Sequence, residues 1–204
     1  LATLQPLSDS DDYDGFALVG RDGLVLAASI EAPVGRRLAP FGWAILGRVL
    51  QGQAVLIPPY RAGEMLVGAE AVLDAPRMYA TAPVRNDAGE VIAAFYLFIP
   101  PEKDFTRILA IARLGKTGDT YAFNRDGLML SDSRHDAQLK AIGLIPDTPE
   151  ARSILRIQVR DPGGDMTRGY RPDAPLAWRP LTKLVAAAVS GDSPNQVLLE
   201  PYRD

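Results

Sequence analysis

The segments RDGLVLAAS (residues 21–29) and RDGLMLSDS (residues 125–133) are identical at six of nine positions, and a short apolar run precedes each of them. Asp-Gly between two apolar runs is a strong signal for a β-hairpin, because the tight turn needs a positive φ that glycine adopts without strain. The spacing of the two copies is longer than the period of solenoid repeats. We therefore expect two domains that open with the same hairpin, and the alternative is a chance similarity of two common turns.

The first hundred residues have the pattern of an antiparallel sheet with one inserted helix. Apolar residues recur at intervals of three and four positions from about Leu38 to Gln51, which predicts a helix that Gly52 ends. The runs AVLIPPY, MLVGAEAVL and RMYATAPV then read as strands, and VIAAFYLFI (residues 91–99) is typical of a central strand. PAS-like folds have this order of elements, so the predicted fold class is α+β.

A connecting helix is predicted between the two copies. Pro100-Pro101 ends the buried strand, and Phe105, Ile108 and Leu109 have helical spacing within residues 102–114. We expect this helix to join a first subdomain at residues 1–101 to a second at residues 115–204.

The second copy has fewer predicted elements than the first. Helices are expected at residues 136–142, at 149–156 and around Leu184, and QVLLEPY near the C-terminus reads as a strand. The later strands of the first copy have no counterpart, so we expect the second subdomain to be truncated. The chain does not begin with Met, and we expect it to be a piece of a longer protein.

Composition excludes several classes of function. The 204 residues are 47% hydrophobic and 23% charged, with a net charge of −3, no cysteine and one histidine. There is no basic patch of the kind that nucleic acid requires, and no disulfide or thiolate site can form. No apolar run of 18 residues occurs, so we expect no membrane span within the chain.

Two longer stretches resemble the double Cache domain, the PAS-like extracytoplasmic sensor region of bacterial signalling receptors. LGKTGDTYAFNRDGLMLSDSR is similar to the opening of the membrane-proximal half, through Gly115, Thr117, Gly118, Asp119, Tyr121 and Asp126-Gly127. MYATAPVRNDAGEVIAAFYLFI is similar to the last two strands of the distal half, through Pro83, Val84, Asn86, Gly89 and Val91. The long first helix of the family is almost absent, and so are the last strands of its proximal half.

The resemblance implies a function as well as a fold. It implies two PAS-like subdomains, each an antiparallel sheet with helices, in the periplasmic part of an inner-membrane histidine kinase, chemoreceptor, cyclase or Ser/Thr kinase. Such a region binds a small solute in the distal subdomain, has no cofactor, can form a homodimer in the full receptor and contacts the membrane only through spans outside this chain. The alternative is a cytoplasmic PAS-like interaction module without a ligand.

The resemblance places the ligand between the distal sheet and a lid at about residues 36–66. The aromatic, hydroxyl and cationic side chains in that region suit a small anionic or zwitterionic ligand. The candidate binding residues are Trp43, Arg48, Tyr60, Arg61, Tyr79, Thr81 and Tyr96. For Trp43 the alternative is a place in the core, and for the two arginines it is the surface. The Y-x4-R-x-W-Y pattern of amino-acid-sensing members is absent, so an α-amino acid is not expected by default.

Catalysis and metal binding have little support in the sequence, and we expect no enzyme. His135 has no partner pattern around it, and Ser131 and Ser133 lack the G-x-S-x-G elbow of a nucleophile. Four aspartates at positions 9, 11, 12 and 14 could bind a hard cation, but they lack the glycine and glutamate of an EF-hand loop. A solvated acidic segment is the preferred interpretation.

Overall fold

The computed structural model describes residues 13–29, 33–61, 64–67, 76–103, 105–112, 115 and 118–191, with only the backbone of Thr167. The chain divides into two compact units, residues 1–108 and 109–204. The predicted strand QVLLEPY, most of MLVGAEAVL and the aspartates at positions 9, 11 and 12 lie outside the described residues. No helix in the described part of the chain has the length and apolar character that a bilayer crossing needs.

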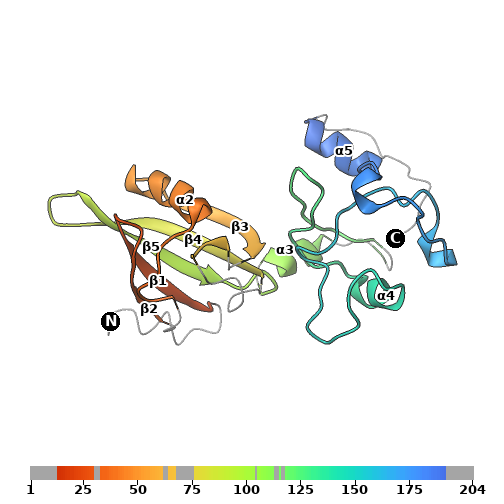
Figure 1. Ribbon diagram of the computed structural model, residues 1–204, viewed down its shortest axis with the longest axis horizontal. Coiled ribbons are helices and arrows are strands. Elements are labelled where there is room, and N and C mark those ends of the chain that lie inside the picture. The colour runs from red at the N-terminus through yellow and green to blue at the C-terminus, as the bar shows by residue number, and fades with distance from the viewer. Residues whose placement is uncertain are drawn as a thin grey trace. The chain divides into compact units, whose positions relative to one another are not determined.

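The first unit contains one antiparallel sheet of five strands in the order β2-β1-β5-β4-β3 (Figure 1). The strands are β1 (Gly15–Gly20), β2 (Val25–Ala28), β3 (Val55–Arg61), β4 (Pro76–Arg85) and β5 (Val91–Ile99). The predicted central strand is β5, which pairs with both β1 and β4. The α+β class is confirmed, and the sheet is compatible with a PAS-like domain.

Helix α2 (Pro40–Leu50) covers one face of this sheet (Figure 1), and we call this face the inner face. Its first turn contains Pro40, where the fixed φ of proline suits a helix start. Leu46 and Val49 have no exposed surface and pack with Ala94 and Tyr96 of β5 in the core. The helix predicted from Leu38 to Gln51 is thus confirmed to within two residues at each end.

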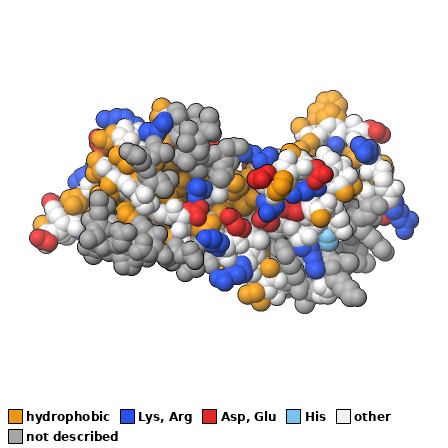
Figure 2. Space-filling model, turned by 90° about the horizontal axis from the view of Figure 1, so that it is seen from below, with side chains coloured by type: hydrophobic (Ala, Val, Ile, Leu, Met, Phe, Trp, Pro, Cys, Tyr) orange, Lys and Arg blue, Asp and Glu red, His pale blue; other side chains and the backbone are white. Residues whose placement is uncertain are grey.

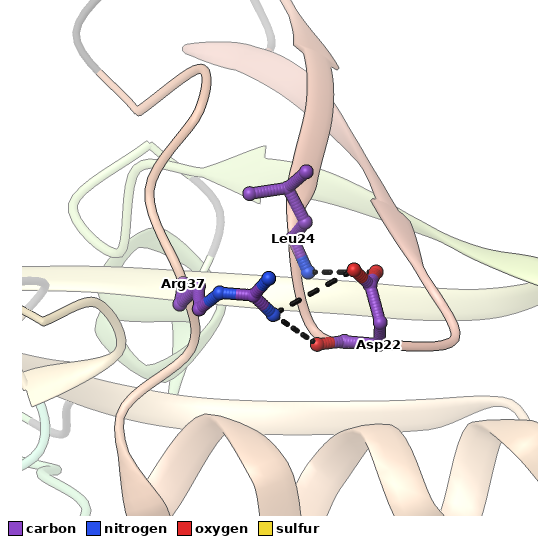
Figure 3. Close-up of polar contacts among 3 residues, drawn as sticks. All are labelled: Asp22, Leu24 and Arg37. Carbon is purple, nitrogen blue, oxygen red and sulfur yellow. Dashed lines mark hydrogen bonds and ion pairs between the residues drawn. The ribbon is translucent and has the colours of Figure 1, made fainter.

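The turn between β1 and β2 is held by a compact set of hydrogen bonds. Gly23 has φ +74° and its amide donates to the carbonyl of Gly20, while the amide of Gly20 donates to the carbonyl of Leu24. Figure 3 shows Asp22 accepting from the amide of Leu24 at 3.2 Å, with Nη1 of Arg37 donating to the carbonyl of Asp22 at 2.9 Å. The predicted hairpin is therefore present, and it is tied to the segment that precedes α2.

The two backbone hydrogen bonds of the first turn recur in the second copy of the motif, with residue numbers 104 higher. Gly127 has φ +77°, and its amide donates to the carbonyl of Asn124. The amide of Asn124 donates to the carbonyl of Leu128. In the first unit the carbonyl of Gly23 accepts from Leu38, and in the second the carbonyl of Gly127 accepts from Val159. The repeated sequence thus corresponds to a repeated local structure, in which a third segment crosses next to the hairpin.

The rest of the second unit consists of short elements. They are α4 (Asp136–Ala141), the 3₁₀ turns η3 (Met166–Arg168) and η4 (Leu176–Trp178), and α5 (Lys183–Ser190). Within residues 118–191 the extended segments form isolated bridges rather than strands of a sheet. The helix predicted at 149–156 is wrong, because Leu155 adopts φ +54° and its amide donates to Met129, so this segment turns back onto the hairpin.

The predicted connecting helix is present as α3 (Phe105–Ile111). It is shorter than the predicted 102–114, and none of its residues is buried. Of the expected apolar stripe, Phe105 and Leu109 are half-buried, whereas Ile108 is 62% exposed. Subdomain boundaries at residues 101 and 115, and a second PAS-like subdomain, stay predictions.

Candidate functional site

Three tyrosines that the sequence identified as candidates lie side by side on the inner face of the sheet. The ring centroids of Tyr60 and Tyr79 are 5.4 Å apart, and those of Tyr79 and Tyr96 are 6.3 Å apart. None of the three is more than 7% exposed. They meet because β3, β4 and β5 are neighbours and each tyrosine falls on the inward side of its strand. Their part in ligand binding stays a prediction.

A small cavity adjoins this row of rings. Its volume is about 30 Å³, and its lining includes Tyr79, Tyr96, Phe98 and the side chain of Arg77. Leu38, Met65 and Leu66, which precede and follow α2 in the chain, cover it. The space holds one or two atoms of the size of water oxygen. The cavity therefore lies between the sheet and the segments that flank α2, and its volume is very small. Residues 55–61 of the predicted lid form strand β3 of the sheet instead.

Arg77 is the cation of this cavity. Its Nη1 atom donates to Oδ2 of Asp14, the residue that comes immediately before β1. The two side chains are 22% and 34% exposed, and the amide of Asp14 donates to the carbonyl of Phe98 on β5. An ion pair thus joins the residue before β1 to strand β4, next to the cavity.

Burial determines the chemistry of the tyrosines. It raises the pKa of Tyr60, Tyr79 and Tyr96 above the ordinary value of 10.0, because the phenolate would lose its hydration. All three are neutral phenols at physiological pH. Among the described residues, the hydroxyl of Tyr96 is buried without a hydrogen-bond partner. A polar ligand atom in the cavity would therefore gain from bonding to Tyr96, since an unsatisfied buried hydroxyl costs about 1–3 kcal/mol.

The other predicted site residues lie elsewhere in the first unit. Trp43 is 43% exposed, and its ring lies over Gly23, where an added Cβ would be 2.6 Å from Cζ2. Arg48 is exposed and its Nε donates to Gln53 at 3.1 Å. Thr81 is buried, and its hydroxyl donates to the carbonyl of Val55 at 3.1 Å. Arg61 is half-buried at the end of β3. None of these four lines the small cavity.

Sequence reasoning missed Arg77 and Asp14 as a pair. Arg77 could have been found, because it stands two positions before Tyr79 and four before Thr81, which puts all three on one side of β4. Its partner could not be found this way, since Asp14 is 63 residues away in the chain.

The second unit contains a larger cavity of about 400 Å³. Asp119, Ser133 and His135 are part of its lining. Oδ2 of Asp119 accepts from the Ser133 hydroxyl at 2.6 Å and from the Arg134 amide at 3.0 Å, so this carboxylate organises the loop after the repeated hairpin. Because the Ser133 hydroxyl donates to Asp119 and accepts from the His135 amide at 3.0 Å, these contacts explain a loop rather than an activated nucleophile.

Two further observations concern charge. Within the described ranges, no group of three or more His, Asp or Glu side chains is placed to hold a metal ion. On the face that Figure 2 shows, Lys and Arg side chains lie among Asp and Glu side chains rather than in one basic field. That distribution agrees with the net charge of −3.

Comparisons with known proteins give low similarities. No family model matches the chain, and no curated protein matches it. The chain is similar to an extracellular ligand binding receptor from Desulfohalobium retbaense, with a TM-score of 0.44 and 15% identity over 63% of this chain and 22% of that one. It is also similar to the VqmA dimer of Vibrio cholerae, described as a LuxR-type receptor, with a TM-score of 0.34 and 12% identity over 62% and 64% of the two chains. The chain spans about a fifth of the first structure's length and less than two thirds of the second's, and similarities this low carry no functional argument.

Proposed function

We propose that the first unit is a sensor module that binds a small anionic or zwitterionic solute in the cavity between its sheet and the segments flanking α2. One observation carries this proposal: Arg77 and Tyr96 line the same space, and the Tyr96 hydroxyl is buried without a hydrogen-bond partner among the described residues. A cation and a neutral donor beside aromatic rings form a suitable site for a carboxylate.

The ion pair of Arg77 offers a route from binding to a change of shape. A ligand carboxylate that bonds Arg77 competes with Asp14 for the same guanidinium donors. Displacing Asp14 would release the residue that leads into β1, whose amide is bonded to Phe98. The ligand would then bind more tightly to a state in which Asp14 is not paired with Arg77. A conformational switch requires such a difference in affinity between two states.

Binding would also require the cavity to open, because about 30 Å³ is far below the roughly 300–1,000 Å³ of ordinary ligand sites. Backbone hydrogen bonds hold the two segments that flank α2 together. The amide of Ala39 donates to the carbonyl of Met65 and the amide of Val67 donates to the carbonyl of Arg37, both at 2.9 Å, and Leu38 forms a bridge with Leu66. Separating these segments would enlarge the cavity without disrupting the sheet.

The setting that we propose follows the double Cache resemblance. The chain would be the extracytoplasmic part of a membrane-bound bacterial signalling receptor, such as a histidine kinase, chemoreceptor, cyclase or Ser/Thr kinase. It would act without enzymatic activity, cofactor or nucleic acid, and it could form a homodimer in the full receptor.

The test is a thermal-shift screen of the chain against a library of small carboxylates, amines and amino acids. A ligand at about 100 times its dissociation constant adds roughly 2.7 kcal/mol to the free energy of unfolding. Arg77→Gln should weaken binding of any hit at least tenfold. Arg48→Gln is the matched control, because Arg48 is exposed and does not line the cavity. Equal effects of the two substitutions would refute the site.

A second candidate function is a PAS-like interaction module without a ligand, and the small volume of the cavity favours it. On this alternative the tyrosines are simply core residues. It predicts that no library member raises the melting temperature, and that Tyr96→Phe changes only stability.

A further inference from the structure

We propose that the second unit has a binding site of its own, and that its ligand is a monocarboxylate with an apolar body. The site is the cavity of about 400 Å³, whose volume lies in the range of ordinary small-molecule pockets. This inference does not depend on the proposed function of the first unit, because the two cavities share no residue.

The cavity lies where the repeated hairpin would place it. We call the segment whose amide donates to the turn glycine the crossing segment; it contains Leu38 in the first unit and Val159 in the second. In the first unit, Val25 of the hairpin and Leu38 line the small cavity. In the second unit Met129 and Val159 make the equivalent hydrogen bonds, and both line the large cavity. The two spaces therefore have the same position relative to the motif. In the first unit Tyr79 and Tyr96 reduce the space, whereas the second cavity stays wide.

Arg160 supplies the charged end of the site. Its Nε donates to Oε1 of Gln158 at 3.0 Å, and its Nη1 donates to the carbonyl of Arg179 at 2.7 Å. These two bonds fix the plane of the guanidinium, and within the described residues the Nη2 group makes no hydrogen bond. A guanidinium held in this way is preorganised for a carboxylate, because two of its five donors are used and the outer edge is not.

The remaining lining explains why an apolar body is expected. Apolar side chains from the hairpin, from α4 and from the crossing segment dominate it, among them Met129, Leu139, Ile142 and Ile157. Asp119, the one carboxylate among the described residues of the lining, already accepts hydrogen bonds from Thr120, Ser133 and Arg134. It is therefore engaged in holding its own loop rather than placed to bind a cationic ligand.

Isothermal titration calorimetry of the chain with octanoate tests the proposal. We expect saturable binding of octanoate, at least tenfold weaker binding of acetate, which lacks the apolar body, and at least tenfold weaker binding of octylamine, which reverses the charge. Arg160→Gln should weaken octanoate binding roughly tenfold to a hundredfold, the range for a charged hydrogen bond. Arg156→Gln is the matched control, since Arg156 is exposed in the same segment and does not line the cavity.

A second variant keeps the test valid if Arg160→Gln unfolds the unit. Ala141 is exposed on α4 and lines the cavity, so Ala141→Trp fills the space without replacing a core contact. It should weaken octanoate binding while leaving the circular dichroism spectrum unchanged. Arg77→Gln should leave octanoate binding unchanged, which separates this site from that of the first unit.

Several results would overturn the proposal. They are no binding of octanoate at millimolar concentration, equal binding of octanoate and octylamine, and binding that neither Arg160→Gln nor Ala141→Trp weakens. A concentration-dependent dimer in sedimentation that Ala141→Trp dissociates would also overturn it, since a second copy of the chain would then occupy the cavity.

Discussion

The Asp14–Arg77 ion pair is the contact on which the proposed switch depends, and its strength can be measured without a ligand. Asp14→Asn and Arg77→Gln, singly and together, form a double-mutant cycle that isolates the interaction between the two side chains. Asp14→Asn keeps the shape of the side chain and removes its charge, whereas Arg77→Gln removes the charge and also shortens the side chain. Because the cycle subtracts the effect of each single replacement, it reports the contact between the two side chains.

The structure indicates an intermediate coupling energy. Exposed ion pairs contribute about 0.2–1 kcal/mol, whereas hydrogen bonds to charged groups contribute about 1.5–3 kcal/mol. With side-chain exposures of 22% and 34%, this pair lies between the two classes. We expect a coupling energy of about 1 kcal/mol, which is lower in high salt because the pair is partly screened. Asp22 and Arg37, 3.6 Å apart and 58% and 59% exposed, should give roughly 0.3 kcal/mol.

Urea unfolding followed by tryptophan fluorescence is the assay. The chain has two tryptophans, and Trp43 is the one in the first unit. Trp178 is 82% exposed, so a Trp178→Phe background removes the other signal at little cost to stability. The midpoint and slope of each transition then give the free energy of unfolding of the first unit alone.

A coupling energy for Asp14 and Arg77 no larger than that of the exposed Asp22–Arg37 pair would refute the reasoning. The second arm uses any carboxylate found in the screen. Because Asp14 is proposed to compete with the ligand, Asp14→Asn should raise the ligand's affinity about tenfold, which corresponds to about 1.4 kcal/mol. An unchanged or weakened affinity would show that Asp14 is not a competitor.

Three further outcomes test the fold and its titration. Leu46→Ala should lower the free energy of unfolding of the first unit by about 2–5 kcal/mol, because the side chain is fully buried between α2 and the sheet; a loss below 1 kcal/mol in the urea assay would contradict this packing. Gly127→Ala should destabilise the repeated turn by roughly 1–2 kcal/mol, because φ is +77° and the new Cβ would be 2.6 Å from Leu181; the measurement is faster hydrogen exchange at the Val159 amide, and an unchanged rate would contradict it. Burial raises the pKa of the three core tyrosines above the unfolded value of 10.0, so the stability that they contribute is present below pH 10 and falls as the pH rises above it. Absorbance at 295 nm should show these three phenols ionising only with unfolding, and reversible ionisation in the folded chain would refute their burial.

Local signals predicted most of the first unit. The Asp-Gly turn, the helix ended by Gly52 and the apolar run of β5 depend on neighbouring residues, and the structure confirms all three. The repeated turn of the second unit is confirmed for the same reason, since the positive φ of Gly127 is a local requirement.

The candidate site was harder to predict because it depends on which strands are neighbours. Tyr79 and Tyr96 were predicted from aromatic residues on candidate inner strands, whereas Tyr60 was predicted as part of the lid and lies on β3 of the sheet. Trp43 and Arg48 were chosen from a helix whose orientation the sequence leaves open. The apolar residues of α2 extend around more than one side, and the structure exposes Phe41 and Trp43 while it buries Leu46 and Val49. Spacing alone does not select among such sides.

The amino-acid sequence by itself determined the α+β class, the hairpin used twice and the elements of the first sheet, because turns and apolar periodicity act over a few residues. Only the tertiary structure decided that Arg77 meets Asp14, that the first cavity has a volume of about 30 Å³ and that the second has a volume of about 400 Å³. Those features arise where residues distant in the chain pack against each other. Their geometry depends on the register of paired strands and on the volumes of side chains that no local pattern encodes.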